Sequence, residues 1–499
     1  MPRKMIYYRQ SMDRQAIEKE KSLIIGQIKK NVPLIRPFFE LKMDLASYSR
    51  QLYDFEVQPA HKERQELVKR KITEKIQKLF GERAMRDLQV NLDAKLAFNI
   101  ADHHMVLSHP FLISANIVSS VGKFLQAKKQ DAIIVISSGD IPPNNYFSRS
   151  GFMFHGKRVP LFSVSEREYT SYFIPSREFD LVKRLKDIGR WKEFSPEEQG
   201  FLIDEEGRMR SFDYSGCDNY TDQMTVAVKN TWPLMFAESM RKTLPELIYI
   251  TQEELITECL IEILQEDNCI SKAVFDPKFR EMVLNNFRGI VTTWRESEGK
   301  GTHFFWRKYP GQPRSLRMFV EGDRLVPHDQ RFANLSVPFE RGAIIDLLRK
   351  REIYPGLFLI FSVLNFYCGV KPLVGFGSAV YLDFIKNAWL RTLKQAGMDE
   401  EARLMSGIET SALVAGLALI FKKTNDKVGP MYAHDIFFDG GITEEYLRQI
   451  FKMRFADAFS VGIADMYDYY SQKYVPPEEK IKRTVGFLDL ASVVFDWVK

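Results

Sequence analysis

The fold of this chain is decided by the run Ala132-Ile133-Ile134-Val135-Ile136, which leads into Ser137-Ser138-Gly139-Asp140. A continuously apolar, β-branched run of this length is typical of a strand buried on both faces of a parallel sheet. Upstream, Leu96–Ile100 predicts a shorter strand and Phe111–Lys129 predicts a helix. Strand, helix and strand at this spacing form a βαβ unit. The sequence therefore predicts an α/β protein with a Rossmann-like parallel-sheet core and large helical additions.

Four segments are expected along the 499 residues. They are a basic helical segment at 1–85, the first part of the Rossmann-like core at 86–175, a helical insertion at 176–300, and a region at 301–499 that completes the core. Two short strands are predicted within 151–165. A hairpin is predicted for Thr302–Tyr309 and Ser315–Leu325, across the turn Pro310-Gly311-Gln312-Pro313. After Pro338 the pattern indicates helices to the end, apart from glycine-rich breaks.

Positive charge is concentrated near the N-terminus. Residues 1–80 hold 18 Lys and Arg against 10 Asp and Glu, whereas the whole chain holds 71 against 65. Such a segment can attract nucleic-acid phosphates or anionic lipid. Acids are interspersed within it, however, which favours a solvated helix face.

The cysteines and the hydropathy of the sequence both predict a cytoplasmic protein. The four cysteines, Cys217, Cys259, Cys269 and Cys368, form no CxxC pair, as is typical of free thiols in a reducing environment. The first residues hold no apolar core of signal-peptide length. The most apolar run, Gly356–Val370, is shorter than the roughly 20 residues of a spanning helix. We expect a buried core helix there, and a cytoplasmic protein without a membrane partner.

Three of the eight histidines, His103, His104 and His109, fall between the first predicted strand and the helix that follows it. Pro110 suits the first turn of that helix. In parallel sheets such turns line the crevice in which ligands bind, and a helix N-terminus favours an anion. We therefore predict that these histidines stabilise a bound anion or move protons. His434, beside Asp435, is interpreted as part of a surface turn.

A second group of polar residues follows the strand at 132–136. It comprises Ser137, Ser138, Gly139, Asp140, Asn144 and Asn145. Small and amide-bearing residues can approach a ligand closely through backbone groups. We predict that this group closes the substrate pocket beside the histidines.

At these residues the chain resembles the bacillithiol-synthesis cysteine-ligase family, whose Rossmann-like core is related to the histidine-motif nucleotidyltransferases. That family has a strand, a Gly-His/Gln-Gln type turn, a short gap and a His/Gly-Pro step into a helix that bears a Lys. Here His103-His104 matches the first pair and His109-Pro110 the second, while Asp102 and Asn116 stand at the Gly and Lys positions. A later patch, from Pro355 through Gly375-Phe376-Gly377 to Tyr381, is similar to that family's proline-to-glycine-pair segment. The resemblance implies a nucleotide-binding enzyme and places Asn116 in its substrate site.

Three functions fit this sequence. The first is a ligase- or transferase-like enzyme that binds a nucleotide or another anionic small molecule at the histidines, with ATP or a related nucleotide as cofactor and no metal. The second is a metal-dependent hydrolase that uses Asp102 with the same histidines, although no HExxH motif is present. The third is a non-enzymatic protein that binds nucleic acid or a protein partner through the basic N-terminal segment.

Overall fold

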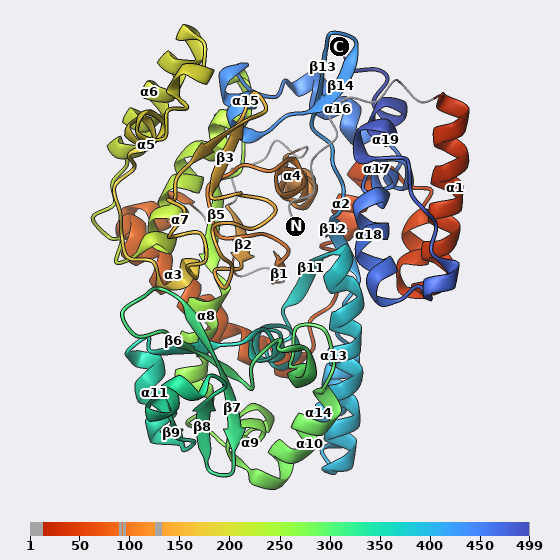
Figure 1. Cartoon of the computed structure of the whole chain (residues 1–499). Coiled ribbons are helices and arrows are strands. Elements are labelled where there is room, and N and C mark those ends of the chain that lie inside the picture. The colour runs from red at the N-terminus through yellow and green to blue at the C-terminus, as the bar shows by residue number, and fades with distance from the viewer. Residues whose placement is uncertain (1–12, 89–91, 93–95, 125–131, 499) are drawn as a thin grey trace.

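In the computed structural model of the chain, residues 13–88, 92, 96–124 and 132–498 are described. The centre of the molecule is a five-stranded sheet in the order β12-β11-β1-β2-β5 (Figure 1), and all of its strand pairs are parallel. The strands are β1 (Ala97–Asn99), β2 (Ile133–Ser137), β5 (Leu247–Thr251), β11 (Lys371–Gly375) and β12 (Ala412–Ala415). The predicted α/β fold, with a parallel-sheet core and helical additions, is confirmed.

Strand β2 is the run that decided the prediction, and all five of its residues are buried. It is paired on both sides, because Asn99 of β1 lies opposite Val135 and Thr251 of β5 lies opposite Ser137. A strand covered on both faces and flanked on both edges has no polar side, which explains its unbroken apolar sequence.

The order of the strands reverses beside β1. The chain first builds outward from β1 through β2 to β5, and then crosses to the opposite side for β11 and β12. In open α/β sheets such a switch point creates a crevice at the carboxyl ends of the strands, where ligands bind. The residues that follow β1, β2 and β11 therefore lie at the edge of interest.

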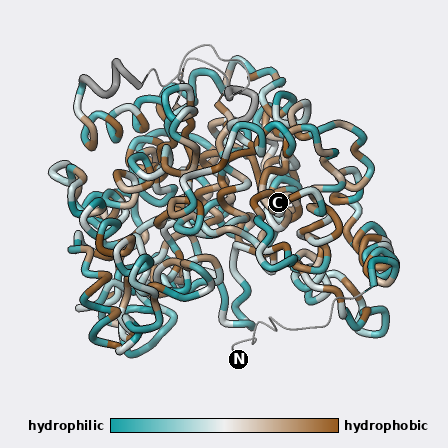
Figure 2. The backbone as a smooth tube through the Cα atoms, turned by 90° about the horizontal axis from the view of Figure 1, so that it is seen from above, coloured by the Kyte–Doolittle hydropathy of each residue, from teal (hydrophilic) through white to brown (hydrophobic). Residues whose placement is uncertain are grey.

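Long helices cover the sheet. Helix α4 (Pro110–Phe124) packs against β1 and β12, whereas α7 (Tyr220–Thr231) and α8 (Gln252–Ile263) pack against β5, and α13 (Phe376–Gln395) packs against β11 and β12. Figure 2 shows apolar stretches gathered in the interior and polar stretches toward the outside. Among the described residues, no helix is both long and apolar enough to cross a membrane. The core helix expected at 356–370 is present as α12 (Leu357–Phe361), which continues into a π-helix at Ser362–Tyr367.

The N-terminal helices are built into the molecule. They are α1 (Arg14–Asn31), α2 (Leu45–Gln51) and α3 (Pro59–Leu88). Helix α1 lies beside the C-terminal helices α18 (Ile463–Lys473) and α19 (Phe487–Val494), as Figure 1 shows in red and blue. It buries Ile17, Ile24 and Ile28, the stripe of an amphipathic helix. Helix α3 packs on α8.

A second sheet, antiparallel, has the order β10-β6-β7-β8-β9. Its strands are β6 (Phe305–Lys308), β7 (Ser315–Glu321), β8 (Arg324–Pro327), β9 (Val337–Pro338) and β10 (Ile353–Pro355). The predicted hairpin is β6 with β7, and its second arm turns again at Gly322 to form β8. The two strands expected within 151–165 are β3 (Gly151–Phe154) and β4 (Lys157–Pro160), which form a hairpin of their own.

Strands β5, β11 and β12 were not predicted, because their segments were expected to be helical. Short apolar runs between helices cannot be told from helical turns by periodicity alone. The same expectation missed β10 and the hairpin of β13 (Phe421–Thr424) and β14 (Lys427–Pro430). The remaining helices are α5 (Leu181–Asp187), α6 (Pro196–Ser211), α9 (Cys269–Phe275), α10 (Pro277–Phe287), α11 (Arg341–Arg349), α14 (Asp399–Ser406), α15 (Ala433–Phe438), α16 (Glu444–Lys452) and α17 (Phe455–Val461).

Candidate functional site

The turn after β1 is hydrogen-bonded to the exit of β2. The Ser138 N–H donates to the Asp102 carbonyl at 2.9 Å, and the His104 N–H donates to the Ser138 carbonyl at 2.8 Å. These two bonds extend the parallel pairing of the strands beyond their ends. They bring the histidine turn and the Ser137–Asp140 segment together at the carboxyl edge of the sheet.

His104 lies completely buried and is used by the protein itself. Its Nε2 lies 2.7 Å from the Thr221 carbonyl of α7, which can only accept, so this nitrogen carries the proton. Its Nδ1 therefore accepts from the Ser137 hydroxyl at 2.8 Å. Burial lowers the pKa of His104 to about 4, so the ring is neutral at physiological pH. It cross-links the turn, β2 and α7, with no ring nitrogen left for a ligand.

In the described ranges, His103 and His109, unlike His104, each form a hydrogen bond through one ring nitrogen only. The His103 Nδ1 donates to Oδ1 of Asn145 at 3.3 Å, and burial lowers its pKa to about 4. The Phe111 N–H donates to Nδ1 of His109 at 3.3 Å, and burial, together with Arg149 and His103, lowers its pKa to about 3. Among the described residues, neither Nε2 takes part in a hydrogen bond.

The two hydrogen bonds set opposite tautomers. Because Nδ1 of His103 is the donor, its Nε2 is an unprotonated acceptor. Because Nδ1 of His109 is the acceptor, its Nε2 carries the proton and is a donor. The two neutral rings therefore offer one acceptor and one donor, although their sequence spacing gives no sign of the difference.

Asp102 and Asn116 belong to a buried network rather than to a surface. Oδ2 of Asp102 accepts from Asn116 at 2.9 Å and from the Tyr249 hydroxyl of β5, and Oδ1 accepts from the His103 N–H at 2.7 Å. Oδ1 of Asn116 accepts from Asn99 at 3.0 Å. Burial raises the pKa of Asp102 to about 6. Both side chains are satisfied internally, which leaves Asn116 no free group for a substrate.

The metal-hydrolase alternative depends on Asp102 as a ligand, and both of its oxygens are engaged by protein donors. In the part of the chain that the structure describes, no three His, Cys, Asp or Glu side chains lie together so that they could hold a metal ion. Asp102 therefore has no oxygen free of protein donors to offer a metal ion at the histidine turn.

A carboxylate pair lies beside the exit of β2. Glu253, in the first turn of α8, accepts from the Gly139 N–H at 2.7 Å and from the Asp140 N–H at 3.0 Å. The Tyr354 hydroxyl of β10 donates to Asp140. Burial first, and then the charge of Glu253, raise the pKa of Asp140 well above its ordinary value, and burial also raises that of Glu253. Gly139 is required here, since a Cβ would lie 2.7 Å from the Thr251 side chain.

The two asparagines have separate positions. Asn145 shapes its own turn, because its Oδ1 accepts from the Phe147 N–H at 2.9 Å and its Nδ2 donates to the Pro142 carbonyl at 2.9 Å. Asn144 is exposed, and its N–H donates to the Arg167 carbonyl at 3.3 Å. Asn145 thus orients His103, while Asn144 joins the turn to the loop that follows β4.

The glycine pair of the second patch reaches the same edge of the sheet. Gly375 ends β11, and a Cβ on it would lie 3.5 Å from the Cβ of Ala101, next to the histidine turn. Gly377, in the first turn of α13, faces Tyr469 of α18, because a Cβ there would lie 3.2 Å from the Tyr469 hydroxyl. The two sequence patches are neighbours across the switch point.

Three polar neighbours of the turn were missed, namely Thr221, Tyr249 and Glu253. Glu253 had a signal, since an acidic pair follows the run at 247–251 after one glutamine. Thr221 and Tyr249 had none, because a threonine in a helix and a tyrosine in a strand carry no pattern. The surface turn expected around His434 is wrong: His434 is buried, with its ring stacked on Phe152 at 3.5 Å between centroids.

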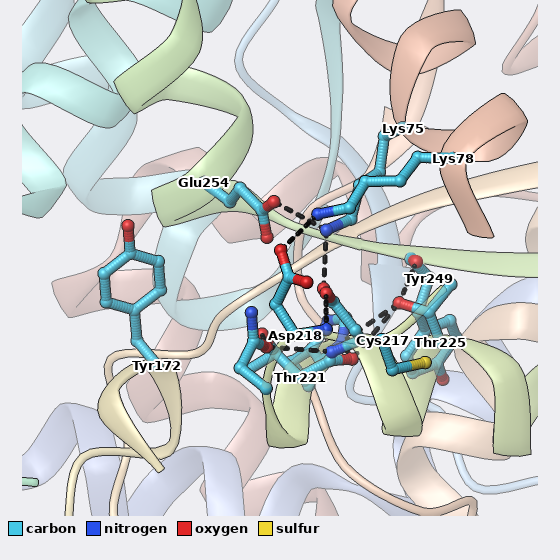
Figure 3. Close-up of polar contacts among 12 residues, drawn as sticks. Lys75, Lys78, Tyr172, Cys217, Asp218, Thr221, Thr225, Tyr249 and Glu254 are labelled. Carbon is cyan, nitrogen blue, oxygen red and sulfur yellow. Dashed lines mark hydrogen bonds and ion pairs between the residues drawn. The ribbon is translucent and has the colours of Figure 1, made fainter. Parts of the chain in front are cut away.

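Two lysines of α3, the nearly buried Lys75 and the partly exposed Lys78, pair with acids beside this site. Lys75 donates to Asp222 of α7 and to Glu254 of α8, at 2.5 Å each, and Lys78 donates to Asp218 at 2.5 Å (Figure 3). Asp222 directly follows Thr221, the partner of His104. These two lysines of the basic N-terminal segment therefore neutralise acids of this same chain.

Comparison of the chain with models of known protein families and with curated protein sequences finds no match.

Proposed function

We propose that this protein is a ligase- or transferase-like enzyme that binds a nucleotide or another anionic small molecule at the histidine turn. The observation that carries the proposal is the pair of opposite tautomers. The protonated Nε2 of His109 can donate to an anionic oxygen of the ligand, and the bare Nε2 of His103 can accept a proton from an attacking group.

Asp140 supplies the complementary group. Its raised pKa keeps it protonated to higher pH than an ordinary aspartate, so it can serve as the acid while His103 serves as the base. Ser138 and Gly139 lie between the turn and Asp140 along the chain that leaves β2. His104, Asn116 and Asp102 keep the turn in position through their buried hydrogen bonds. ATP or a related nucleotide is the cofactor that we propose.

Ligand binding tests this proposal. ATP or citrate at a hundredfold excess over its dissociation constant should stabilise the folded state by roughly 2.7 kcal/mol, which a thermal-shift measurement detects as a raised melting temperature. His109→Ala and His103→Ala should remove most of the shift. His328→Ala is the matched control, because His328 is exposed in the antiparallel sheet. Shifts that are equal in all four proteins would refute the site. If the shift depends on the histidines, the product released from ATP, phosphate or pyrophosphate, identifies the type of transfer.

A further inference from the structure

Two arginines, one on β4 and one in the loop that follows it, have unused hydrogen-bond donors. Arg158 lies on β4 and Arg167 in the loop that follows it, and both are half-buried. The Nε atom of each is buried and has no hydrogen-bond partner among the described residues. A buried guanidinium donor without a partner is costly, because it has lost water and gained nothing in exchange.

Three carboxylates of this region, those of Glu166, Glu193 and Glu198, are already engaged by other cations. Glu166 pairs with Arg177 at 3.2 Å and with Arg184 at 3.6 Å. In the same way, Glu193 pairs with Arg190 at 2.6 Å and Glu198 with Lys157 at 2.7 Å. In the described parts of the chain, neither Arg158 nor Arg167 forms an ion pair with a carboxylate. Among the residues that the structure describes, these two positive charges therefore have no carboxylate paired with them.

The same loops lead to the histidine turn. The Asn144 N–H donates to the Arg167 carbonyl at 3.3 Å, and the Arg149 N–H donates to the Asn145 carbonyl at 2.9 Å. Arg149 and Ser150 both have positive φ, 49° and 67°, which costs conformational energy in residues with a side chain. Burial, and then the charges of Arg167, Arg190 and Arg149, lower the pKa of Arg158. The charge of Arg149 also lowers the pKa of His109. Arg149 is therefore close enough to affect both Arg158 of the hairpin and His109 of the turn.

We propose that Arg158 and Arg167 form a phosphate-binding site, and that the ligand of the histidine turn is a phosphorylated molecule whose phosphate chain they hold. Guanidinium groups bind phosphate through paired N–H donors, and a phosphate supplies the negative charge that the region lacks. The second part of this statement rests on the proposed function. The first part requires only the β3–β4 hairpin and its loop.

Pyrophosphate and tripolyphosphate are the probes, and isothermal titration measures their binding to the full chain. We expect both to bind the wild-type protein, and Arg158→Gln and Arg167→Gln each to weaken the affinity by about tenfold or more. Arg210→Gln is the control, because Arg210 of α6 is paired with Asp180 at 2.6 Å, and it should leave the affinity unchanged. Arg158→Lys, which keeps the charge but loses the fork, should bind more weakly than wild type.

The melting temperature without ligand separates a binding role from a structural one. Removing one of several repelling charges should leave it unchanged or raise it in Arg158→Gln. A large decrease in the melting temperature would overturn the proposal. So would a variant with both Arg158→Gln and Arg167→Gln that binds pyrophosphate as tightly as wild type. The two proposals can fail separately. His109→Ala should bind pyrophosphate as wild type does, so pyrophosphate binding that is unchanged in the arginine variants refutes the arginine site alone. ATP binding that is unchanged in His109→Ala refutes the histidine site.

Discussion

The lysines of α3 and the arginines of the β3–β4 hairpin carry the same charge in opposite surroundings. Lys75 is nearly buried and lies 2.5 Å from each of two carboxylates, Asp222 and Glu254. Arg158 and Arg167 are half-buried and have no described carboxylate partner. The first set connects α3 to α7 and α8, whereas the second has a net charge that an outside molecule can neutralise.

This difference teaches that a basic segment in a sequence is not by itself a binding surface. The surplus of positive charge in residues 1–80 suggested nucleic acid as one partner, yet Lys75, Lys78 and Arg70 pair with acids of the same chain. Although burial disfavours its charge, the two carboxylates raise the pKa of Lys75. Charge that the fold compensates contributes to folding, and charge that it leaves uncompensated is available for recognition.

The largest effect is expected at Lys75. Lys75→Met should lower the free energy of unfolding by about 3–5 kcal/mol, because it leaves the buried Asp222 without its cation and leaves Glu254 with Arg351 alone, at 3.9 Å. Urea denaturation at neutral pH measures the change. A decrease below about 1 kcal/mol would show that the Lys75 ion pairs stabilise the fold no more than surface pairs do. The difference between Lys75 and the hairpin arginines would then be wrong.

An intermediate effect is expected at His104, and it depends on pH. Since burial lowers its pKa from 6.5 to about 4, the unfolded chain takes up a proton below pH 6.5 and the folded chain does not. The stability that this ring contributes is complete above pH 6.5 and is lost as the pH falls toward 4. Between pH 7 and pH 5, wild type should lose about 2 kcal/mol more than His104→Gln, which cannot titrate.

Urea midpoints at the two pH values measure this difference. His328→Gln serves as the control, because that histidine is exposed and its replacement should leave the acid-induced loss as in wild type. Equal losses in wild type and His104→Gln would show that His104 is not the enclosed, neutral cross-link described above.

The smallest effect is expected at Lys78, one helical turn from Lys75. Its side chain is 45% exposed and that of its partner Asp218 is 70% exposed. Lys78→Met should therefore change the free energy of unfolding by no more than about 1 kcal/mol, and 0.5 M salt should abolish most of that change. A loss as large as that of Lys75→Met would mean that burial does not distinguish these two pairs.

Part of the fold could be predicted from local sequence. The β2 run and the Pro110 helix start predicted the βαβ unit, because a continuous apolar run and a helix cap are signals within a few residues. The other strands of the sheet, such as β5 and β12, are short apolar segments beside helices. Their strand conformation depends on neighbours that are distant in the sequence, since Leu247 of β5 lies opposite Ile133 and Ala412 of β12 lies opposite Leu373.

The candidate site divides in the same way. The concentration of histidines on one strand-to-helix turn was visible, and so was the polar exit of β2. Which ring nitrogens the protein itself occupies was not visible, since that depends on Ser137, Thr221 and Asn145, whose side chains or carbonyls bond to particular nitrogens. Asn116 was assigned to the substrate by its position in a motif, yet Asn99, Asp102 and Tyr249 enclose it.

By itself the sequence determined the class of fold, the central strand and the turn on which polar chemistry is concentrated, because these follow from hydrophobic runs, proline and residue type over short distances. The tertiary structure alone decided the strand order, the tautomer of each histidine and the division of the positive charges into paired and unpaired. Those properties depend on which side chains meet across the sheet, and hydrogen bonds and ion pairs are decided within about 4 Å, whatever the separation along the chain.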